Sequence, residues 1–498
     1  MNQLALYQPA DVRQIDAAAI ERCGIPGYVL MQRAAAAAYQ EAVQRWPVAS
    51  RWVVLAGLGN NGGDGIELAR LARADGRNVQ LLLSGDPVSL TGAAAEAWAA
   101  WQADDGPSPA NELGDLHPED LVVDALFGIG LSRPVEGRAA RWIEAVVAAK
   151  VPVLSLDCPS GLDASSGQML GPAIRAAVTV TFIARKLGLY LADGPDCVGE
   201  VVLADCDVPP AAFDAVEPAA QLLGPGALRQ TWPTRTTHQH KGHFGHVLIV
   251  GGQAGMPGAV LMAARAALRS GAGLVSVATH PAHAALLPLA QPELMSHAMD
   301  DPAALVDLIE PATAVVCGPG LGQSEWARTL LETVCVSAGP RAVVLDADAL
   351  NLLASSPVAL PERSVLTPHP GEAARLLGTT TANVQADRLR ALSALVARWG
   401  RAVVLKGAGS WVGAPGERPS LCVAGNPGMG TGGMGDVLSG LLGAALAGPM
   451  RAGALAPLVG GAVLAHALAG DEAADRLGQA GLLPSDLIAS LPNIIPRP

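Results

Sequence analysis

The chain has few aromatic residues, few charged residues and no apolar run long enough to cross a membrane. Aromatic side chains make up 3% and charged side chains 16% of its 498 residues, whereas hydrophobic residues make up 50%. A chain of this composition can bury a large core, so we expect a folded protein rather than an intrinsically disordered one. The apolar segments 437–448 and 453–470 are shorter than the ~20 residues that a spanning helix needs. We therefore interpret both as buried helices and expect no membrane association.

Clustered basic residues and paired cysteines are also missing. Lys and Arg number 33 against 45 Asp and Glu, and no basic block is long enough to follow a nucleic-acid backbone, so we expect no nucleic-acid partner. The seven cysteines are scattered and form no CxxC pair, which argues against a disulfide framework and against structural zinc. A reducing, cytoplasmic location fits this pattern. The start of the chain lacks the basic and apolar regions of a signal peptide.

The pattern of apolar segments predicts two domains of the α/β class. Short apolar strands alternate with helical segments in both halves, which is typical of parallel sheets covered by helices. The strands expected in the first half are 51–56, 78–83, 121–125 and 151–157, and those expected in the second half are 246–250, 274–278, 314–317, 342–346, 364–367 and 402–405.

The remaining segments predict how the two domains are joined. Residues 1–39 are expected to form helices before the first sheet, with Asp11 or Asp16 as caps. Residues 207–239 contain five prolines and few periodic apolar positions, which indicates an interdomain linker. We therefore expect domains at 1–222 and 223–498.

The glycine-rich run from Gly425 to Gly440 is the strongest functional signal. It contains one carboxylate, Asp436, and leads directly into an apolar helical segment. A glycine loop that opens a helix directs unpaired N–H groups at one point and binds anions there. Asp436 beside a bound phosphate would serve as the base for a reacting hydroxyl, which indicates phosphoryl chemistry. A glycine-rich surface turn is the alternative, because the chain has 57 glycines.

Polar residues follow several other strands of the second half. Asp346 and Asp348 suit either a site near Mg²⁺ or a helix cap, and His369 with Glu372 lies in a turn made rigid by prolines. The turn 406–410 places a cation and backbone amides at a strand end, where they suit phosphate. The three histidines of 240–246 favour a flexible entry loop over a metal cluster.

The first half has its own set of strand-end oxygens. The loop 57–65 follows a strand and precedes the helix expected at 66–74, which suits a phosphate on backbone amides. Its Asn and Asp side chains also suit a hard cation. Asp124 and the turn 157–163 end two further strands of the same sheet. Each Asp alone could be a helix cap, and their meeting at one edge favours a site.

The first half resembles the NAD(P)H-hydrate epimerases over roughly residues 1–220. The resemblance rests on Gly59-Asn-Asn-Gly-Gly-Asp-Gly65, Asp124-Ala-Leu-Phe-Gly, Asp157-x-Pro-Ser-Gly-Leu-Asp163 and Lys186-x-Gly188. It implies a Rossmann-like three-layer sandwich, with Asp157 as a candidate acid or base. The resemblance places K⁺ on Asn61, Asp124 and Ser160. The substrate contacts that it implies are Asn60, Asn61, Gly62, Gly63, Asp64, Gly128, Ile129, Gly130, Leu131, Ser132, Arg133, Pro134 and Asp157.

The second half is similar to the ADP-dependent NAD(P)H-hydrate dehydratases, whose fold is ribokinase-like, over roughly residues 231–491. The shared motifs are Lys241-Gly-x-x-Gly245, Gly318-Pro-Gly-Leu-Gly322, Asp346-Ala-Asp348, Pro368-His-Pro-Gly-Glu372, Lys406-Gly407 and the glycine-rich run. The chain departs mildly from the family at Ser410, where Thr is usual, and at Gly430 and Met434.

The two resemblances together imply repair of NAD(P)H that has been hydrated at C6 of the nicotinamide ring. The first domain would interconvert the R and S hydrates. The second would phosphorylate the S hydrate from ADP with Mg²⁺, so that phosphate leaves and NAD(P)H, AMP and phosphate are formed. Asp436 would be the base, and the amides of 432–435 would hold the phosphoryl group. The implied hydrate contacts are Gly322, His369 and Asp436, and the implied nucleotide contacts are Lys406, Gly407, Ala408, Gly409, Ser410 and Gly435.

Two further expectations rest on the family alone. ADP rather than ATP is expected from the two-domain arrangement, and a homo-oligomer, such as a tetramer, from the ribokinase-like dehydratases. The residues leave one functional alternative open, because the same glycine loop and Asp serve simple phosphorylation. In that case the chain would be a small-molecule kinase for a vitamin-precursor alcohol, with a non-catalytic nucleotide-binding first domain.

Overall fold

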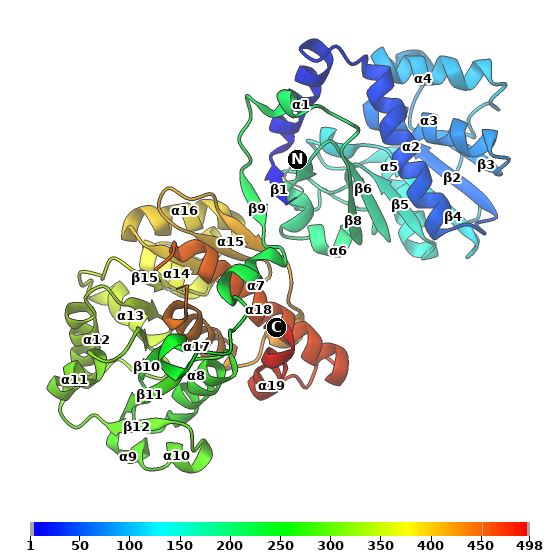
Figure 1. Ribbon diagram of the computed structural model, residues 1–498. Helices are drawn as coiled ribbons and strands as arrows, with labels where there is room; N and C mark the ends of the chain where they lie inside the picture. The colour runs from blue at the N-terminus through cyan, green and yellow to red at the C-terminus, as the bar shows by residue number, and fades with distance from the viewer. Residues whose placement is uncertain (1–3, 451, 496–498) are drawn as a thin grey trace. The chain divides into compact units, whose positions relative to one another are not determined.

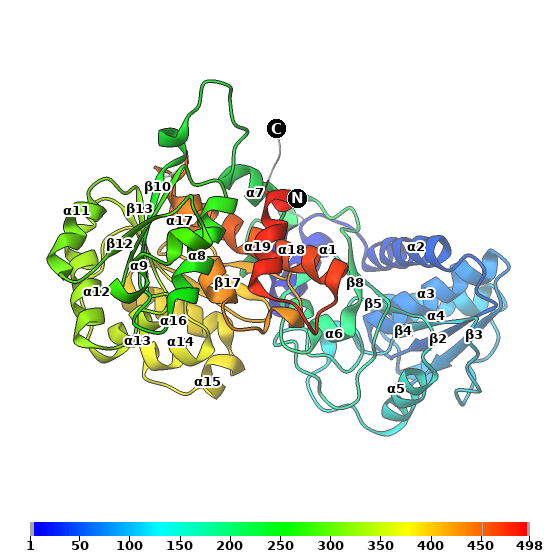
Figure 2. The ribbon, with the colours of Figure 1, turned by 90° about the horizontal axis from the view of Figure 1, so that it is seen from below.

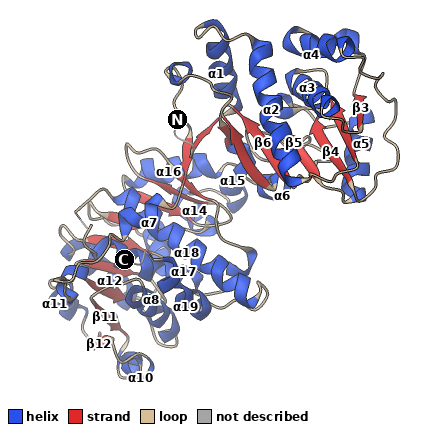
Figure 3. Cartoon of the chain, turned by 45° about the vertical axis from the view of Figure 1, so that its right-hand side comes forward, coloured by secondary structure: helices blue, strands red, loops and turns tan. Residues whose placement is uncertain are grey.

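The computed structural model describes residues 4–450 and 452–495 and divides into two compact units, Met1–Ala220 and Gln221–Pro498. Each unit has strands in its interior and helices on the outside (Figure 3). The α/β class predicted from the sequence is therefore confirmed, and the two units are described in turn.

The first unit is built on a six-stranded parallel sheet in the order β3-β2-β4-β5-β6-β8. Strands β1 and β7 are not part of this sheet and pair with each other in parallel. The strands are β1 (Ala5–Tyr7), β2 (Arg51–Ala56), β3 (Val79–Leu83), β4 (Asp120–Ala125), β5 (Val153–Leu156), β6 (Val178–Phe182), β7 (Arg185–Lys186) and β8 (Glu200–Ala204). The helices are α1 (Pro9–Glu21), α2 (Gly27–Arg45), α3 (Asn60–Ala74), α4 (Gly92–Ala103), α5 (Gly137–Ala149) and α6 (Gly194–Val198).

Alternating side chains of the strands bury both faces of this sheet. Trp52 and Val54 of β2 pack with α2, α3 and α4, whereas Val53 and Leu55 pack on the other face with α5. Figure 2 shows the strands β2 and β4 between these two helical layers. A strand buried on both faces reads as a continuous apolar run, as 51–56 does. The Rossmann-like three-layer sandwich is confirmed.

Three local predictions for the first unit need correction. Helix α3 begins at Asn60 rather than Ile66, so most of the expected loop forms the first turns of the helix. Gly62 permits this, because a Cβ there would lie 2.0 Å from the backbone oxygen of Gly57. Residues 5–7 form a strand rather than a helix, and residues 1–3 lie outside the described chain. Asp11 accepts the N–H of Gln8 at the start of α1, but Asp16 lies inside that helix and caps nothing.

The second unit has a larger mixed sheet in the order β12-β11-β10-β13-β14-β15-β16-β17-β18-β9. The strands from β12 to β16 are parallel, and β17 runs antiparallel to β16 and β18. They are β9 (Ala220–Leu222), β10 (His246–Val250), β11 (Leu274–Thr279), β12 (Met295–Ala298), β13 (Ala314–Cys317), β14 (Ala342–Leu345), β15 (Ser364–Leu366), β16 (Ala402–Leu405), β17 (Ser410–Gly413) and β18 (Ser420–Cys422).

Helices cover both faces of this sheet as well. Helices α8, α17, α18 and α19 share one core with alternate strand residues, while α12 contacts β13 and α16 contacts β16 (Figure 1). The helices are α7 (Gly226–Thr231), α8 (Pro257–Arg269), α9 (Pro281–Ala284), α10 (Leu287–Ala290), α11 (Leu305–Ile309), α12 (Glu325–Ser337), α13 (Asp348–Ser355), α14 (Pro370–Leu377), α15 (Thr381–Ala386), α16 (Arg388–Trp399), α17 (Met434–Ala447), α18 (Leu455–Leu477) and α19 (Pro484–Ile494).

The apolar segments 437–448 and 453–470 lie in α17 and α18, both largely buried in this core. A helix that is apolar all round belongs inside a large domain or a membrane. In the part of the chain that the structure describes, no helix combines the length and apolarity needed to cross a bilayer.

The proline-rich stretch 207–239 is not a structureless linker. Residues 221 and 222 pair with β18 in parallel, and α7 contacts α18. The prolines mark turns between these short elements, so composition alone missed the strand and the helix.

We expect Gly440→Ala to lower the stability of the second unit. A Cβ at this position of α17 would lie 1.9 Å from the backbone oxygen of Ala263 in α8, and backbone cannot move aside as a flexible side chain can. Overpacking of this kind costs ~1–3 kcal/mol. Thermal unfolding should show a lower transition temperature, whereas the control Gly258→Ala, which meets no atom within 4 Å, should not. An unchanged transition for Gly440→Ala would contradict this packing.

Candidate active sites

The glycine-rich run ends where α17 begins. Gly433 precedes the helix with φ 97°, in the left-handed region that favours glycine, and α17 starts at Met434. Asp436 therefore lies in the first turn, where the backbone N–H groups lack helical partners and attract anions. The anion-binding geometry expected from the sequence is present here.

A buried ion pair lies directly under this helix start. The Asp346 carboxylate is 1% exposed and accepts hydrogen bonds from Lys406 Nζ at 2.6 Å, Thr367 Oγ1 at 2.8 Å and Ser439 Oγ at 2.7 Å. Burial alone would raise the pKa of Asp346, but the Lys406 ammonium and the hydroxyl donors hold that pKa below its usual range. Burial would likewise lower the pKa of Lys406, and Asp346 and Glu372 raise it. Both groups are thus charged, and Asp346 is fully engaged.

Asp436 has the opposite electrostatics. Burial and the nearby negative charge of Asp346 raise the pKa of Asp436 to about 7, with Lys406 opposing the shift and Asp348 adding to it. A carboxyl group with this pKa can accept a proton near neutral pH, as a general base must. The pair Asp346 and Asp436 therefore has divided roles, one charged and structural and the other able to exchange a proton.

The turn before α14 contributes His369 and Glu372 to the same site. The ring Nδ1 of His369 accepts the N–H of Gly371 at 3.0 Å, and Glu372 Oε2 accepts the N–H of His369 at 2.8 Å. The same oxygen of Glu372 lies 4.0 Å from Lys406 Nζ. Burial raises the pKa of Glu372 to about 7, and burial and Lys406 lower the pKa of His369, which keeps its ring neutral. Glu372 belongs to the motif 368–372 but was not predicted as a residue of the site.

Hydrogen bonds from Arg388, a residue that was not predicted for the site, hold the turn 406–410 in place. Arg388 of α16 donates to the backbone oxygens of Leu405, Lys406 and Gly409 at 3.2, 3.2 and 3.1 Å. Ser410 Oγ donates to the oxygen of Gly407 at 3.1 Å, which closes the turn. Arg388 begins a helix with no motif around it, so no local signal links it to residues seventeen to twenty-one positions away.

Two aspartates, Asp471 and Asp348, accept hydrogen bonds from backbone N–H groups of the predicted glycine motifs. Asp471 of α18 accepts the N–H of Gly425 and the side-chain amide of Asn426, both at 2.9 Å. Asp348 accepts the N–H of Gly322 at 2.8 Å, and its charge also acts on Asp436. Asp348 is the first residue of α13, but the N-cap is Ala347 and has no side-chain cap, so the hydrogen bond from Gly322 to Asp348 is not the predicted helix cap. The structure thus brings Lys406, Glu372 and the first turns of α17 together around Asp346.

The first unit contains a cavity of about 530 Å³ at the carboxyl ends of its strands. Six of the predicted residues line it: Asn60, Asn61, Asp64, Ile129, Gly130 and Asp157. Residues that were not predicted as contacts line it too, among them Asp16, Lys186, Arg13 and Met31. The predicted contacts that do not line it are Gly62, Gly63, Gly128 and the segment 131–134.

Three predicted cation ligands lie at the same edge. Asp124 is fully buried, and its Oδ2 accepts the N–H of Ser160 at 2.8 Å and Ser155 Oγ at 3.0 Å. Both polar atoms of the Asn61 side chain are buried without a hydrogen-bond partner in the described chain. A buried amide that lacks partners indicates a missing ligand. Oxygen donors beside a buried carboxylate fit a hard cation.

Asp157 is held at the end of β5 by a buried lysine. It has φ 63°, and its Oδ1 accepts hydrogen bonds from Lys186 Nζ and from the N–H of Phe182 at 3.2 Å. Lys186 is 1% exposed and also donates to Thr181 Oγ1 at 3.0 Å and to the Phe182 oxygen at 2.7 Å. Lys186 belongs to the motif Lys186-x-Gly188, from which no role was predicted for its side chain.

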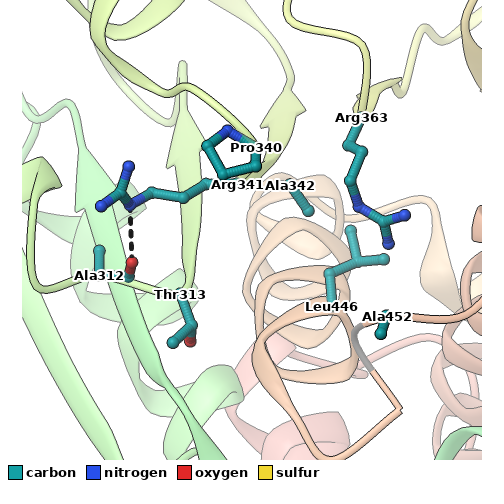
Figure 4. A pocket seen from close by; sticks show the side chains of 8 residues that line it. All are labelled: Ala312, Thr313, Pro340, Arg341, Ala342, Arg363, Leu446 and Ala452. Atoms are coloured by element: carbon teal, nitrogen blue, oxygen red, sulfur yellow. Dashed lines mark hydrogen bonds between the residues drawn. The ribbon is translucent and has the colours of Figure 1, made fainter.

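Two other clusters do not add a site. The histidine-rich loop forms a short turn closed by its own rings, with His240 Nδ1 accepting the N–H of Gly242 at 3.2 Å. No group of three metal-binding side chains occurs among residues 4–450 and 452–495. A cavity of about 350 Å³ lies at the opposite edge of the second sheet, where Arg341 Nε donates to the Ala312 oxygen at 2.9 Å (Figure 4). Its two arginines do not converge on a common point.

These features define a class of protein: an α/β enzyme with a phosphate-handling site in one unit and a cavity lined by carboxylates in the other. A family profile described as NAD(P)H-hydrate dehydratase matches residues 247–493, and one described as YjeF-related protein N-terminus matches residues 27–188. The chain belongs to the family of bifunctional NAD(P)H-hydrate repair enzymes.

Relatives of this family align over nearly the whole chain. The bifunctional NAD(P)H-hydrate repair enzyme of Coxiella burnetii is 44% identical over 98% of this chain and 98% of its own. That of Escherichia coli is 40% identical over 97% of this chain and 93% of its own.

Solved structures match the second unit. A ribokinase-like protein from Enterococcus faecalis covers 56% of this chain and 96% of its own with a TM-score of 0.52 and 29% identity. The ADP/ATP-dependent NAD(P)H-hydrate dehydratase from Bacillus subtilis, co-crystallised with ATP and Mg²⁺, covers 55% and 97% with a TM-score of 0.50 and 29% identity. The predicted ribokinase-like fold is confirmed.

We expect Lys406→Met to destabilise the second unit by about 3 kcal/mol, because it leaves the Asp346 charge buried and unpaired. The double variant Lys406→Met with Asp346→Asn should recover part of that loss, since the uncompensated charge is gone. Denaturant unfolding of the single and double variants measures both quantities. Equal stabilities of the single variant and the unaltered chain would show that the pair is not buried as described.

Proposed function

We propose that the first unit interconverts the R and S hydrates of NADH and NADPH and that the second unit dehydrates the S hydrate with ADP. The chain is a bifunctional enzyme of NAD(P)H-hydrate repair, an isomerase and a lyase that act on small molecules with a nucleotide. The observation that carries the lyase assignment is the meeting of Asp436, the helix start of α17 and Lys406 in one site. The helix start and Lys406 can bind the phosphoryl donor, and Asp436 can accept the proton of the attacking hydroxyl.

In the proposed reaction, Asp436 takes the proton of the C6 hydroxyl while that oxygen attacks the β-phosphorus of ADP. The amides of 432–435 stabilise the charge on the transferring phosphoryl group, and AMP leaves. The new phosphate ester is a good leaving group, so loss of phosphate and of the C5 proton forms the ring double bond. His369, neutral and fixed by its turn, and Gly322 would contact the hydrate. Lys406–Ser410 and Gly435 would hold the nucleotide.

Mg²⁺ fits this site as a companion of the nucleotide. Asp346, the obvious carboxylate, is already occupied by Lys406, Thr367 and Ser439. Mg²⁺ commonly binds through substrate phosphates and keeps several waters, which requires no dedicated protein cage. When bound, it would neutralise the diphosphate charge.

K⁺ fits the first unit. The unpartnered amide of Asn61, the buried carboxylate of Asp124 and the hydroxyl of Ser160 supply oxygens and one negative charge. The cation would stabilise the Asp124 charge, since burial raises the pKa of that carboxyl when no cation is present. It would also fix the strand ends that border the cavity.

The kinase alternative has weaker support. It requires a non-catalytic first unit, yet that unit holds a cavity with several charged side chains. The relatives that align over both units are named as repair enzymes. The seven free cysteines support a reducing, cytoplasmic location, and the family resemblance supports a homo-oligomer such as a tetramer.

The function is tested on the full chain with each epimer and each nucleotide. We expect ADP with the S hydrate to restore the absorbance of reduced nicotinamide, and the R hydrate to follow through the first unit. Asp436→Asn should reduce dehydration at least ~10²-fold, the range for acid–base groups. Below pH about 7, Asp436 becomes protonated and the rate should fall with acid. Stable phosphorylation of an alcohol without recovered NAD(P)H would instead identify a kinase.

The cation site predicts a specific salt response. Replacing tetramethylammonium chloride by KCl at equal ionic strength should raise the unfolding temperature of the first unit, because a ligand that binds only the folded state stabilises it. Asp124→Asn should abolish the difference. A response of equal size in that variant would mean that K⁺ acts elsewhere.

A further inference from the structure

We propose that Asp64 is the proton donor of the epimerisation and that Asp157, positioned by Lys186, is its proton acceptor. This inference rests on the proposed function of the first unit and assigns the acid and the base within its cavity.

The four charged groups involved converge from separate elements. Asp16 comes from α1, Asp64 from α3, Asp157 from the end of β5 and Lys186 from β7, and all line the 530 Å³ cavity. Three carboxyl groups, the amine of Lys186 and the guanidinium of Arg13 line this space, and Arg13 donates to the backbone oxygen of Ile129 at 2.7 Å. The amine forms an ion pair with one carboxylate, Asp157, so the cavity favours a proton on another.

The contacts identify Asp157 as the carboxyl group paired with the amine. Lys186 Nζ donates to Asp157 Oδ1, and the N–H of Phe182 donates to the same oxygen at 3.2 Å. Asp157 also lines the cavity, where its carboxylate can accept a proton. Lys186 acts through Asp157 and is a positioning residue.

Asp64 has the properties of a protonated acid. It is 8% exposed, and burial raises its pKa well above the usual range, with the charges of Asp157 and Asp16 adding to the effect and Lys186 opposing it. The thiol of Cys206 is the remaining titratable group near it, and burial raises the pKa of Cys206 to about 12, so it stays neutral. Carboxyl groups whose environments differ in this way divide acid and base roles.

The chemistry needs both roles at once. Asp157 takes the C6 hydroxyl proton, the C6–N1 bond breaks with its electron pair going to nitrogen, and nitrogen takes the proton of Asp64. A C6 carbonyl results. After rotation about C5–C6, nitrogen attacks the opposite face, Asp157 returns its proton to oxygen and Asp64 regains the proton from nitrogen. Atoms and charge balance without any co-reactant, and the carbon inverts.

The first test is the rate of R-to-S conversion, followed by chromatography of the two hydrates without nucleotide. Asp64→Asn should lose at least ~10²-fold, as a deleted acid–base group does. Asp64→Glu should recover part of the loss, and the exposed control Asp115→Asn should match the unaltered chain. S-hydrate dehydration by the same molecule should be unchanged in all three, which excludes general misfolding of the second unit. Full activity of Asp64→Asn would overturn the proposal.

The second test uses the pH profile, which a structural role would not move. Epimerisation should fall at high pH as Asp64 loses its proton. Asp16→Asn removes one of the charges that raise the pKa of Asp64, so this alkaline limb should move to lower pH. An unmoved limb would overturn the assignment of Asp64.

The positioning role of Lys186 has its own readout. Lys186→Met should reduce the epimerisation kcat more than it changes KM, since Asp157 loses its orientation and its countercharge, and Lys186→Arg should restore part of kcat. Equal loss in both variants would contradict the role. If the unaltered chain interconverts no hydrates, the proposed function itself fails. If it does so and the variants are unaffected, only this inference fails.

Discussion

Parallel strands end at the same edge of a sheet, and both sites of this protein depend on that constraint. Asp124 and Asp157 come from neighbouring strands of the first sheet, and Asp346 and Lys406 from nearby strands of the second. Residues sixty positions apart are thereby brought to 2.6 Å without any local contact between them. Open α/β sheets bind ligands at this edge for the same reason.

The two sites share one electrostatic arrangement of lysine and aspartate side chains. In each, a lysine forms an ion pair with one aspartate, Lys406 with Asp346 and Lys186 with Asp157. A second aspartate nearby, Asp436 or Asp64, has no such partner, and burial raises its pKa. A carboxylate paired with an ammonium group thus lies close to one whose pKa is raised, which is the condition for divided acid and base roles.

Much of this arrangement was predictable from the sequence because its signals are local. The strand 51–56 and the helical segment after Asp436 are continuous apolar runs, and both were located correctly. The glycine-rich run predicted an anion site because a glycine-rich loop and the start of a helix can both be recognised within a few residues of sequence. Arg388, Asp471 and the role of Lys186 were not found. Their partners lie far away in the chain, and a single Arg, Asp or Lys has no pattern of its own.

The sequence by itself determined the class of the fold, the family and the chemical groups available at each strand end, since these follow from apolar periodicity and short motifs. Only the tertiary structure decided which carboxylates are paired and which are left to titrate. Asp64 and Asp157 are the same residue type and are buried to nearly the same extent, and they differ because the ammonium group of Lys186 contacts only Asp157. Burial and distance are properties of the packed chain, so no reading of the residues in order could assign them.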